Sequence, residues 1–388
     1  MKSKWTYRPL GELVSFASGG TPSKKRDGYW GGTIPWISAK TLKTENIDTS
    51  DLFITEEGLK AGSKIAPKGS ILLLTRGSGL FNGIPIARVE KDVAFNQDIK
   101  CLDSYGEVEN EFIFYWLLSQ KDYLMAKVGV TGIGAGKFDL DFLQKLMIPI
   151  PSERERKSIV GFANSISEKI RCNAKVNDNL LAQAQTLYKQ FFPYGVQDDL
   201  PDGWRIGTVG EIIEIHDSKR IPLSGADRTK MEKKIYPYYG AASLMDFVDN
   251  YIFDGKYLLL GEDGTVVDDA GYPILQYVWG QFWVNNHAHI LTGRLGYDVE
   301  SLYMLFKQTP VKSIVTGAVQ PKISQANLRS VQVVIPPEHN LREYNDLVEP
   351  LFSLFRANEE ECKTFTALRD MLLPKLMSGE IDVSAVQL

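Results

Sequence analysis

The sequence has little of what secreted, metal-binding or membrane proteins require. Its 388 residues include three cysteines, Cys101, Cys172 and Cys362, and no two of them have the close spacing of a zinc site or a redox pair. This pattern argues against a disulfide framework and fits a reducing compartment. No apolar run approaches the roughly 20 residues that a membrane helix needs, and no signal-peptide pattern begins the sequence. We therefore expect a soluble, cytoplasmic protein.

Signatures of common catalytic sites are also missing. The sequence contains no GxxxxGK[ST], GxSxG or HExxH motif and no Asn/Asp-Pro-Pro-aromatic tetrapeptide of amino-methyltransferases. Glu153, Glu155 and Lys157 resemble a nuclease cluster, but acidic residues at a helix start are explained by the helix dipole. His287 and His289 stand two apart without a third ligand, so we predict no metal site. The chain is predicted to have no catalytic residue of its own.

A strongly basic composition is missing as well. The chain has 44 Lys and Arg against 48 Asp and Glu, which gives a net charge of −4 at pH 7. A stand-alone DNA-binding domain is usually clearly basic, because phosphate contacts dominate its affinity. If the ligand is DNA, we expect a partner protein to supply further phosphate contacts.

An internal repeat organises what is present. Trp5 recurs at Trp204, and Leu72–Leu74 recurs at Leu258–Leu260. From residue 130 to residue 187 a constant offset of 185 matches the first copy to the second without a gap. The protein is therefore two copies of one unit, which diverged mostly in their first two thirds.

Each copy changes character partway along. Its first part has short apolar runs bounded by glycine, which predict strands of a mixed α/β domain, and a short helix at 111–120 or 299–308. Its last part is polar with an apolar stripe at helical spacing, which predicts a helix of about 40 residues. We expect the second of these helices to kink at Pro350 and to end near Pro374. Two such helices are too long for one domain to bury, so they are expected to pack on each other.

The predicted fold class is therefore α+β, with two mixed α/β domains related by pseudo-two-fold symmetry and joined by two long antiparallel coiled-coil helices. The expected boundaries are 1–151 for the first domain, 152–193 for the central helix, 194–336 for the second domain, and 337–388 for the C-terminal helix and tail. Asn173 and Asn358 fall at the midpoints of their stripes, so we predict that they hydrogen-bond across the seam and fix its register. Two solvent-facing asparagines are the simpler alternative.

Cationic and polar loops in both copies are the candidate nucleic-acid contacts. A Gly-rich turn at 18–26 ends in three cations, and Arg76 directly follows a predicted strand, where a bidentate contact to guanine is possible. Lysines and Arg26 would serve mainly phosphate, although each loop taken singly could be an ordinary solvated loop. The candidate DNA-binding residues are Thr21, Ser23, Lys24, Lys25, Arg26, Arg76, Ser78, Asn96, Lys137, Ser218, Lys219, Arg220, Arg228, Asn285, Asn286 and Lys322.

The sequence resembles the specificity subunits of type I restriction–modification enzymes over nearly its whole length. The motifs that carry the resemblance are WTYRPLGEL at 5–13, GGTPS at 19–23, IPWI at 34–37, IPIP at 148–151, LPDGW at 200–204 and LLPKLMSGEI at 372–381. Two departures stand out. Arg156 and Leu341 replace the glutamine that is common after IPxP, and the second copy has Asp217–Arg220 in place of GGTPS.

The resemblance implies that each domain is a target-recognition domain that reads one half of a split double-stranded DNA target, while the helices set the distance between the halves. It also implies docking to methyltransferase subunits and, through them, to restriction subunits. S-adenosylmethionine, ATP and Mg²⁺ are expected only in those partners, and no cofactor in this chain. Two other classes remain open, namely the recognition part of a self-sufficient DNA methyltransferase or nuclease, and an assembly scaffold that binds protein.

Overall fold

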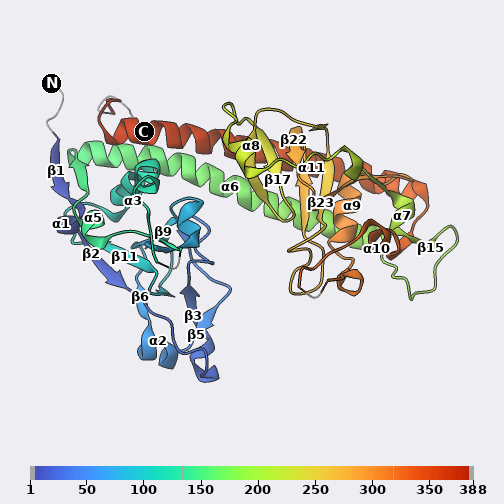
Figure 1. Cartoon of the computed structure of the whole chain (residues 1–388), viewed down its shortest axis with the longest axis horizontal. Helices are drawn as coiled ribbons and strands as arrows, with labels where there is room; N and C mark the ends of the chain where they lie inside the picture. The colour runs from blue at the N-terminus through green and yellow to red at the C-terminus, as the bar shows by residue number, and fades with distance from the viewer. Residues whose placement is uncertain (1–4, 133, 318, 384–388) are drawn as a thin grey trace. The chain divides into compact units, whose positions relative to one another are not determined.

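The chain forms two compact units in the computed structural model, which describes residues 5–132, 134–317 and 319–383. Unit 1 comprises Met1–Cys172 with Glu361–Leu388, and unit 2 comprises Asn173–Glu360. Two helices contribute to both units, α6 (Glu153–Phe191) and α11 (Glu338–Met377), which are green and red in Figure 1. Each unit is a mixed α+β domain that includes part of both helices, so the predicted fold class is confirmed.

Unit 1 contains a five-stranded and a four-stranded sheet. The first has the order β2-β11-β7-β9-β4, formed by Val14–Ser18, Ile99–Ser104, Ile71–Leu74, Ile86–Val89 and Asn46–Ile47. The second has the order β5-β3-β10-β6, formed by Phe53–Ile54, Trp30–Ile37, Val93–Phe95 and Lys64–Ala66. All four residues of β7 are buried, because this apolar strand is covered on both of its faces.

Smaller elements complete unit 1. β1 (Thr6–Pro9) pairs with β14 (Met147–Ile150), and β12 (Gly129–Val130), β13 (Gly136–Lys137) and β8 (Arg76–Gly77) form a three-stranded sheet. The helices are α1 (Leu10–Leu13), α2 (Glu56–Gly62), α3 (Asn110–Ser119), α4 (Lys121–Met125) and α5 (Leu140–Gln144). α3 packs on α6, where the Tyr115 hydroxyl donates to Asn164 Oδ1 at 2.6 Å. This helix lies beside α6 in Figure 1.

Unit 2 repeats the architecture of unit 1. Its sheets have the orders β16-β23-β20-β21, β18-β17-β22-β19 and β15-β24. The strands are β15 (Arg205–Thr208), β16 (Ile213–Ile215), β17 (Tyr236–Tyr239), β18 (Leu244–Val248), β19 (Phe253–Asp254), β20 (Tyr257–Gly261), β21 (Leu275–Val278), β22 (Gln281–Val284), β23 (Ala288–Gly293) and β24 (Gln332–Ile335). The helices are α7 (Val209–Ile212), α8 (Gly225–Thr229), α9 (Val299–Phe306) and α10 (Gln325–Arg329). A parallel strand pair recurs in both units, β3 with β10 and β17 with β22, which confirms the internal repeat.

Strand pairing corrects the repeat alignment by one residue. Leu102 lies opposite Phe16, the third residue of β2, and Leu291 lies opposite Ile215, the third residue of β16. The central strands then pair with Ile71 opposite Leu102 and Leu258 opposite Leu291. Ile71 therefore corresponds to Leu258, whereas the sequence matched Leu72 to Leu258. A run of similar apolar residues cannot define its own register, but the hydrogen-bonded ladder does.

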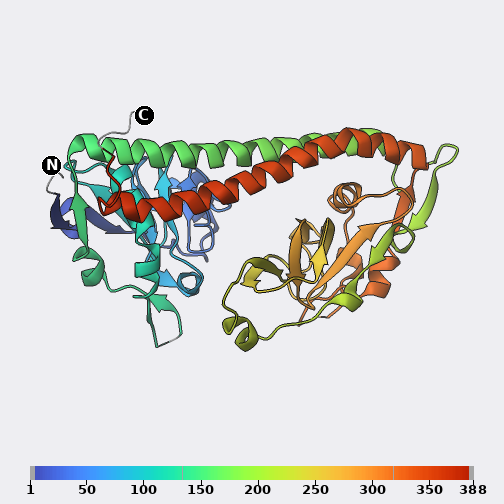
Figure 2. The same cartoon turned by 90° about the horizontal axis from the view of Figure 1, so that it is seen from above.

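The two long helices run antiparallel within each unit (Figures 1 and 2). In unit 1, Lys169 Nζ of α6 lies 2.9 Å from Glu361 Oε2 of α11. In unit 2, the Tyr344 hydroxyl of α11 donates to the Ala184 carbonyl of α6 at 3.2 Å. Later residues of one helix thus face earlier residues of the other, as predicted. α11 includes both Pro350 and Pro374 and ends at Met377.

Buried asparagines lie in the seam between the helices, and two of them are the asparagines predicted to fix its register. Asn173 and Asn358 are 5% and 9% exposed, which overturns the alternative of two solvent-facing asparagines. Asn358 Nδ2 donates to Oδ1 of Asn177 at 2.9 Å, and Asn177 is itself 3% exposed. A direct bond between Asn173 and Asn358 stays a prediction. The register contact that the structure shows belongs to Asn177, one turn further along α6 than Asn173.

The Asn177–Asn358 contact predicts a measurable coupling. Replacing either residue with alanine leaves a buried polar partner unsatisfied, at a cost of about 1–3 kcal/mol in the free energy of unfolding. A double-mutant cycle of Asn177→Ala and Asn358→Ala should give a coupling of about 1 kcal/mol by urea denaturation. Val176→Ala, at an exposed position next to Asn177, is the control. Strict additivity of the two asparagine substitutions would contradict the register role.

Candidate nucleic-acid interface

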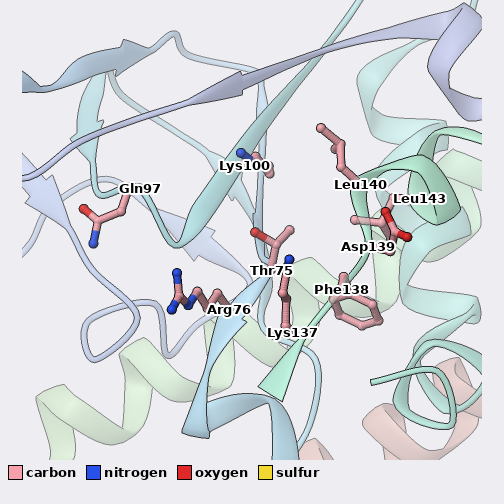
Figure 3. A pocket seen from close by; sticks show the side chains of 9 residues that line it. All are labelled: Thr75, Arg76, Gln97, Lys100, Lys137, Phe138, Asp139, Leu140 and Leu143. Carbon is pink, nitrogen blue, oxygen red and sulfur yellow. The ribbon is translucent and has the colours of Figure 1, made fainter. Parts of the chain in front are cut away.

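A cationic pocket opens at one end of the five-stranded sheet of unit 1. It has a volume of about 280 Å³, and its lining residues are Thr75, Arg76, Gln97, Lys100, Lys137, Phe138, Asp139, Leu140 and Leu143. Figure 3 shows the side chains of Arg76, Lys100 and Lys137, which come from β8, β11 and β13, around this space. Three cations against the single carboxylate of Asp139 make the pocket attractive to an anion.

Backbone hydrogen bonds place the cations together. β7 ends at Leu74, and the amide of the buried Thr75 donates to the Asp98 carbonyl at 2.8 Å. The Thr75 carbonyl in turn accepts from the amide of Phe138 at 2.9 Å. Arg76, which follows Thr75, and Lys137, which precedes Phe138, are therefore direct partners in the β8–β13 ladder. Two of the predicted DNA-contacting residues, 61 positions apart in the sequence, thus meet at one site.

The charges of Arg76 and Lys137 are available to a ligand. Both residues are exposed, and within the described part of the chain neither side chain has an ion-pair partner. Lys100 is half-buried, and its Nζ donates to the hydroxyl of Ser18. Lys100 was not among the residues predicted from the sequence, because the pairing of β11 with β7 that brings it to the pocket is a long-range contact. An unpaired guanidinium beside two ammonium groups is suited to phosphate or to a base edge.

The Gly-rich turn of unit 1 lies next to this pocket. The Thr21 hydroxyl donates to Gln97 Oε1 at 2.7 Å, and Gln97 lines the pocket. A Cβ atom at Gly19 would lie 2.0 Å from the Phe95 carbonyl oxygen, so the glycine is required by close packing of the turn against β10.

The cations that follow the turn are exposed. Ser23, Lys24 and Lys25 lie on the surface, and Ser78 is exposed in the turn after β8. Arg26 donates from Nη1 to the Tyr29 hydroxyl at 2.8 Å, and its guanidinium lies 5.5 Å from the centre of the Tyr29 ring. The tyrosine holds the Arg26 side chain in place while its charge remains in solvent.

Two predicted contacts, Asn96 and Asn285, are buried instead. Their exposed fractions are 5% and 4%. Asn96 Oδ1 accepts from the amide of Asp98 at 3.2 Å, and Asn285 Oδ1 accepts from the amide of His287 at 2.8 Å. Both asparagines therefore close the same local turn in the two units. Their side chains have a structural role that explains why the sequence repeats them.

The cationic segments of unit 2 are partly neutralised within the unit. Ser218, Lys219 and Asn286 are exposed. Arg228 is half-buried, with its guanidinium 4.8 Å from the centre of the Tyr238 ring and Nη1 3.3 Å from Asp246 Oδ2. Arg228 therefore ties α8 to the adjacent sheet, and its charge is already balanced.

Arg220 lies in a buried charge cluster of unit 2. Its Nη1 lies 2.5 Å from Glu262 Oε2 and its Nη2 lies 3.4 Å from Asp217 Oδ2. Lys322 Nζ lies 3.3 Å from Glu262 Oε1. Burial raises the pKa of Asp217, but the hydrogen bond and charge of His289, with help from the Ile290 amide and Arg220, outweigh it and keep this pKa below its ordinary value. The predicted contacts Arg220 and Lys322 thus have internal carboxylate partners.

Asp217, Glu262 and His289 offer ligand atoms within 4.8 Å of one another, a spacing that would suit a metal ion. The guanidinium of Arg220 already lies between the two carboxylates. The His289 ring nitrogens contact Asp217 Oδ2 at 2.6 Å and the Ile323 carbonyl at 2.8 Å. His289 is fully buried and is thus hydrogen-bonded within the core of unit 2.

The fold and the pocket define a binding protein with two repeated domains, and comparison with known proteins gives its family. The model of the type I restriction modification DNA specificity domain matches residues 2–182 and 201–361. The chain therefore belongs to this family. Within the described residues, no helix is long and apolar enough to cross a membrane.

Individual relatives agree with this assignment. The type I restriction enzyme MjaIX specificity subunit of Methanocaldococcus jannaschii is 24% identical over 417 residues, which cover 98% of this chain and 94% of that one. The EcoprrI specificity subunit of Escherichia coli is 23% identical, with coverage of 85% and 83%. The crystal structure of the type I restriction–modification system S subunit from M. genitalium has a TM-score of 0.53 at 18% identity and covers 96% of both chains. This last likeness concerns the fold.

Proposed function

We propose that the chain is the sequence-specific DNA-recognition subunit of a type I restriction–modification complex. Unit 1 and unit 2 each read one half of a bipartite double-stranded target. The observation that carries the proposal is the cationic pocket of unit 1, in which Arg76, Lys100 and Lys137 converge on one opening. Family membership supports the same function over most of the chain.

The proposed DNA-contacting set is narrower than the sequence alone suggested. In unit 1 it consists of Thr21, Ser23, Lys24, Lys25, Arg26, Arg76, Ser78 and Lys137, with Lys100 added. In unit 2 it keeps Ser218, Lys219 and Asn286, which are exposed. Asn96 and Asn285 are left out because they are buried, and Arg220, Arg228 and Lys322 because carboxylates already neutralise them.

The remaining parts of the complex are assigned to other polypeptides. We propose that the chain carries no catalytic residue and no cofactor, and that methyltransferase subunits dock on it and connect it to restriction subunits. S-adenosylmethionine, ATP and Mg²⁺ belong to those partners in this proposal. The chain's net charge of −4 supports such a division, because additional phosphate contacts have to come from elsewhere. The recognition domains are residues 1–151 and 194–336, with the helices as the spacer.

A domain exchange tests the proposal. Residues 1–151 are replaced by the corresponding domain of another family member, and methylated sites are mapped in the host genome with the original gene, the exchanged gene and no gene. We expect one half of the methylated motif to change and the other half to persist. An unchanged motif would contradict DNA reading by this domain, and methyl transfer by the purified chain alone would identify a self-sufficient enzyme instead.

A further inference from the structure

Glu262 and Thr75 occupy the same position in the two units. The amide of Thr75 donates to the Asp98 carbonyl, and the amide of Glu262 donates to the His287 carbonyl, both at 2.8 Å. The carbonyl of Thr75 accepts from the amide of Phe138 at 2.9 Å, and the carbonyl of Glu262 accepts from the amide of Ile323 at 2.8 Å. This correspondence agrees with the strand register that relates Ile71 to Leu258.

The next residue in each unit carries the opposite charge. Arg76 pairs with Lys137 across the β8–β13 ladder, and Asp263 forms the matching β-bridge with Lys322. Asp263 is therefore the counterpart of Arg76, at the place where unit 1 presents an exposed guanidinium. The sequence repeat does not reveal this relation, because it matches Leu72 to Leu258 and would therefore place Glu262 opposite Arg76. The strand register matches Ile71 to Leu258 and places Asp263 there.

The carboxylate of Asp263 is held by a histidine and is partly exposed. His287 Nδ1 lies 2.5 Å from Asp263 Oδ1, and the side chains of His287 and Asp263 are 44% and 18% exposed. Because a carboxylate only accepts hydrogen bonds, Nδ1 is the donor, and the contact leaves Oδ2 for another donor. Lys322, which faces Asp263 in the β-bridge, pairs with Glu262 instead.

We propose that Asp263 is a base-reading residue of unit 2 and accepts a hydrogen bond from an exocyclic amino group in the major groove of the second half-site. Arg76 takes the same place in unit 1 and donates to guanine. The inference rests on the proposed function and deepens it. Aspartate accepts well from cytosine N4 but repels the O6 and N7 acceptors of guanine, whereas arginine does the reverse. The same position in the two units thus selects a hydrogen-bond acceptor on the base in the first half-site and a hydrogen-bond donor in the second.

Deleting the amino group from the DNA tests the proposal directly. The chain, assembled with its methyltransferase subunit, is titrated with duplexes that carry 2-pyrimidinone for cytosine or purine for adenine, one position at a time. At one position of the second half-site, we expect loss of the amino group to weaken binding by roughly 5- to 100-fold. The modified base that has this effect identifies cytosine or adenine as the ligand.

The Asp263→Ala variant supplies the protein side of a double-mutant cycle between Asp263 and the amino group of the base. In this variant the same amino deletion should cost less than about twofold, while discrimination in the first half-site stays unchanged and shows that the protein is folded. Asp269→Ala, at an exposed acidic position shortly after Asp263, is the matched control and should keep the full penalty.

Two outcomes overturn the inference alone. The first is an amino-deletion penalty that persists in Asp263→Ala, and the second is a uniform loss of affinity across all duplexes. A wild-type complex with no sequence preference at all would instead contradict the proposed function, so that the two failures are distinguishable.

Discussion

The Arg76→Ala variant is expected to bind its recognition sequence roughly 5- to 100-fold more weakly and to lose discrimination at one base pair of the first half-site. Arg76 is exposed and its guanidinium has no ion-pair partner among the described residues, so its removal leaves no internal charge unbalanced. The loss therefore reports on the ligand. Binding of the partner-assembled complex to duplexes with single base-pair changes is the measurement.

Lys137→Ala separates a base contact from a phosphate contact at the same pocket. If Lys137 neutralises a phosphate, the variant weakens binding to all sequences alike and lowers the slope of log K against log salt by about one. Lys68→Ala is the matched control, because Lys68 is exposed and precedes β7, whereas Arg76 follows it. Equal losses for Lys68→Ala and Lys137→Ala would contradict a pocket-specific role.

Arg369→Ala is expected to lower the free energy of unfolding of unit 1 by about 3 kcal/mol, because it leaves a largely buried carboxylate without its main partner. Arg369 of α11 donates from Nη1 and Nη2 to the two oxygens of Glu45, at 2.6 and 3.0 Å. The arginine side chain is 5% exposed and that of Glu45 is 29% exposed. Urea denaturation measures the loss.

The effect of Arg369→Ala should depend on pH. Burial raises the pKa of Glu45, but Arg369 and Lys121 together outweigh it, so this pKa lies below its ordinary value of 4.5. Such a group stabilises the fold above its unfolded-state pKa, and the contribution is lost as pH falls through the folded-state pKa. The difference between wild type and variant should therefore be full near neutral pH and shrink below pH 4.5.

An exposed ion pair on α6, the helix that runs antiparallel to α11, provides the control for Arg369→Ala. Lys157 and Glu153 lie 2.6 Å apart with side chains that are 70% and 65% exposed. Solvent-exposed pairs contribute little, so Lys157→Ala should leave the denaturation midpoint unchanged. A pH-independent difference for Arg369→Ala would show that lost packing, not the pairing with Glu45, explains the destabilisation.

Periodicity and repetition in the sequence predict the large elements of this fold. The apolar stripe and the lack of proline between 152 and 192 predict α6, which spans Glu153–Phe191. The expected helices at 111–120 and 299–308 are α3 and α9. These features depend on local spacing of apolar residues, which a sequence displays directly.

The details of the site depend on contacts that no local pattern contains. Lys100 reaches the pocket only because β11 lies beside β7, and Asn177 meets Asn358 only because of the helix register. Arg220 has the appearance of a surface cation in a polar loop, yet Glu262, 42 residues later, neutralises it. Long-range pairing decides which charges remain available, and the spacing of residues along the chain does not express it.

Unit 1 is built from two segments that are far apart in the sequence, and this has a consequence for the synthesis and truncation of the protein. Leu373, Leu376, Met377 and Val383 belong to the same buried cluster as the central strand β7. The core around β7 is thus completed by residues that are translated after the whole of unit 2. A stop codon shortly after residue 360 would remove part of the core of unit 1 and so damage that unit. Unit 2, which ends at Glu360, would stay largely intact.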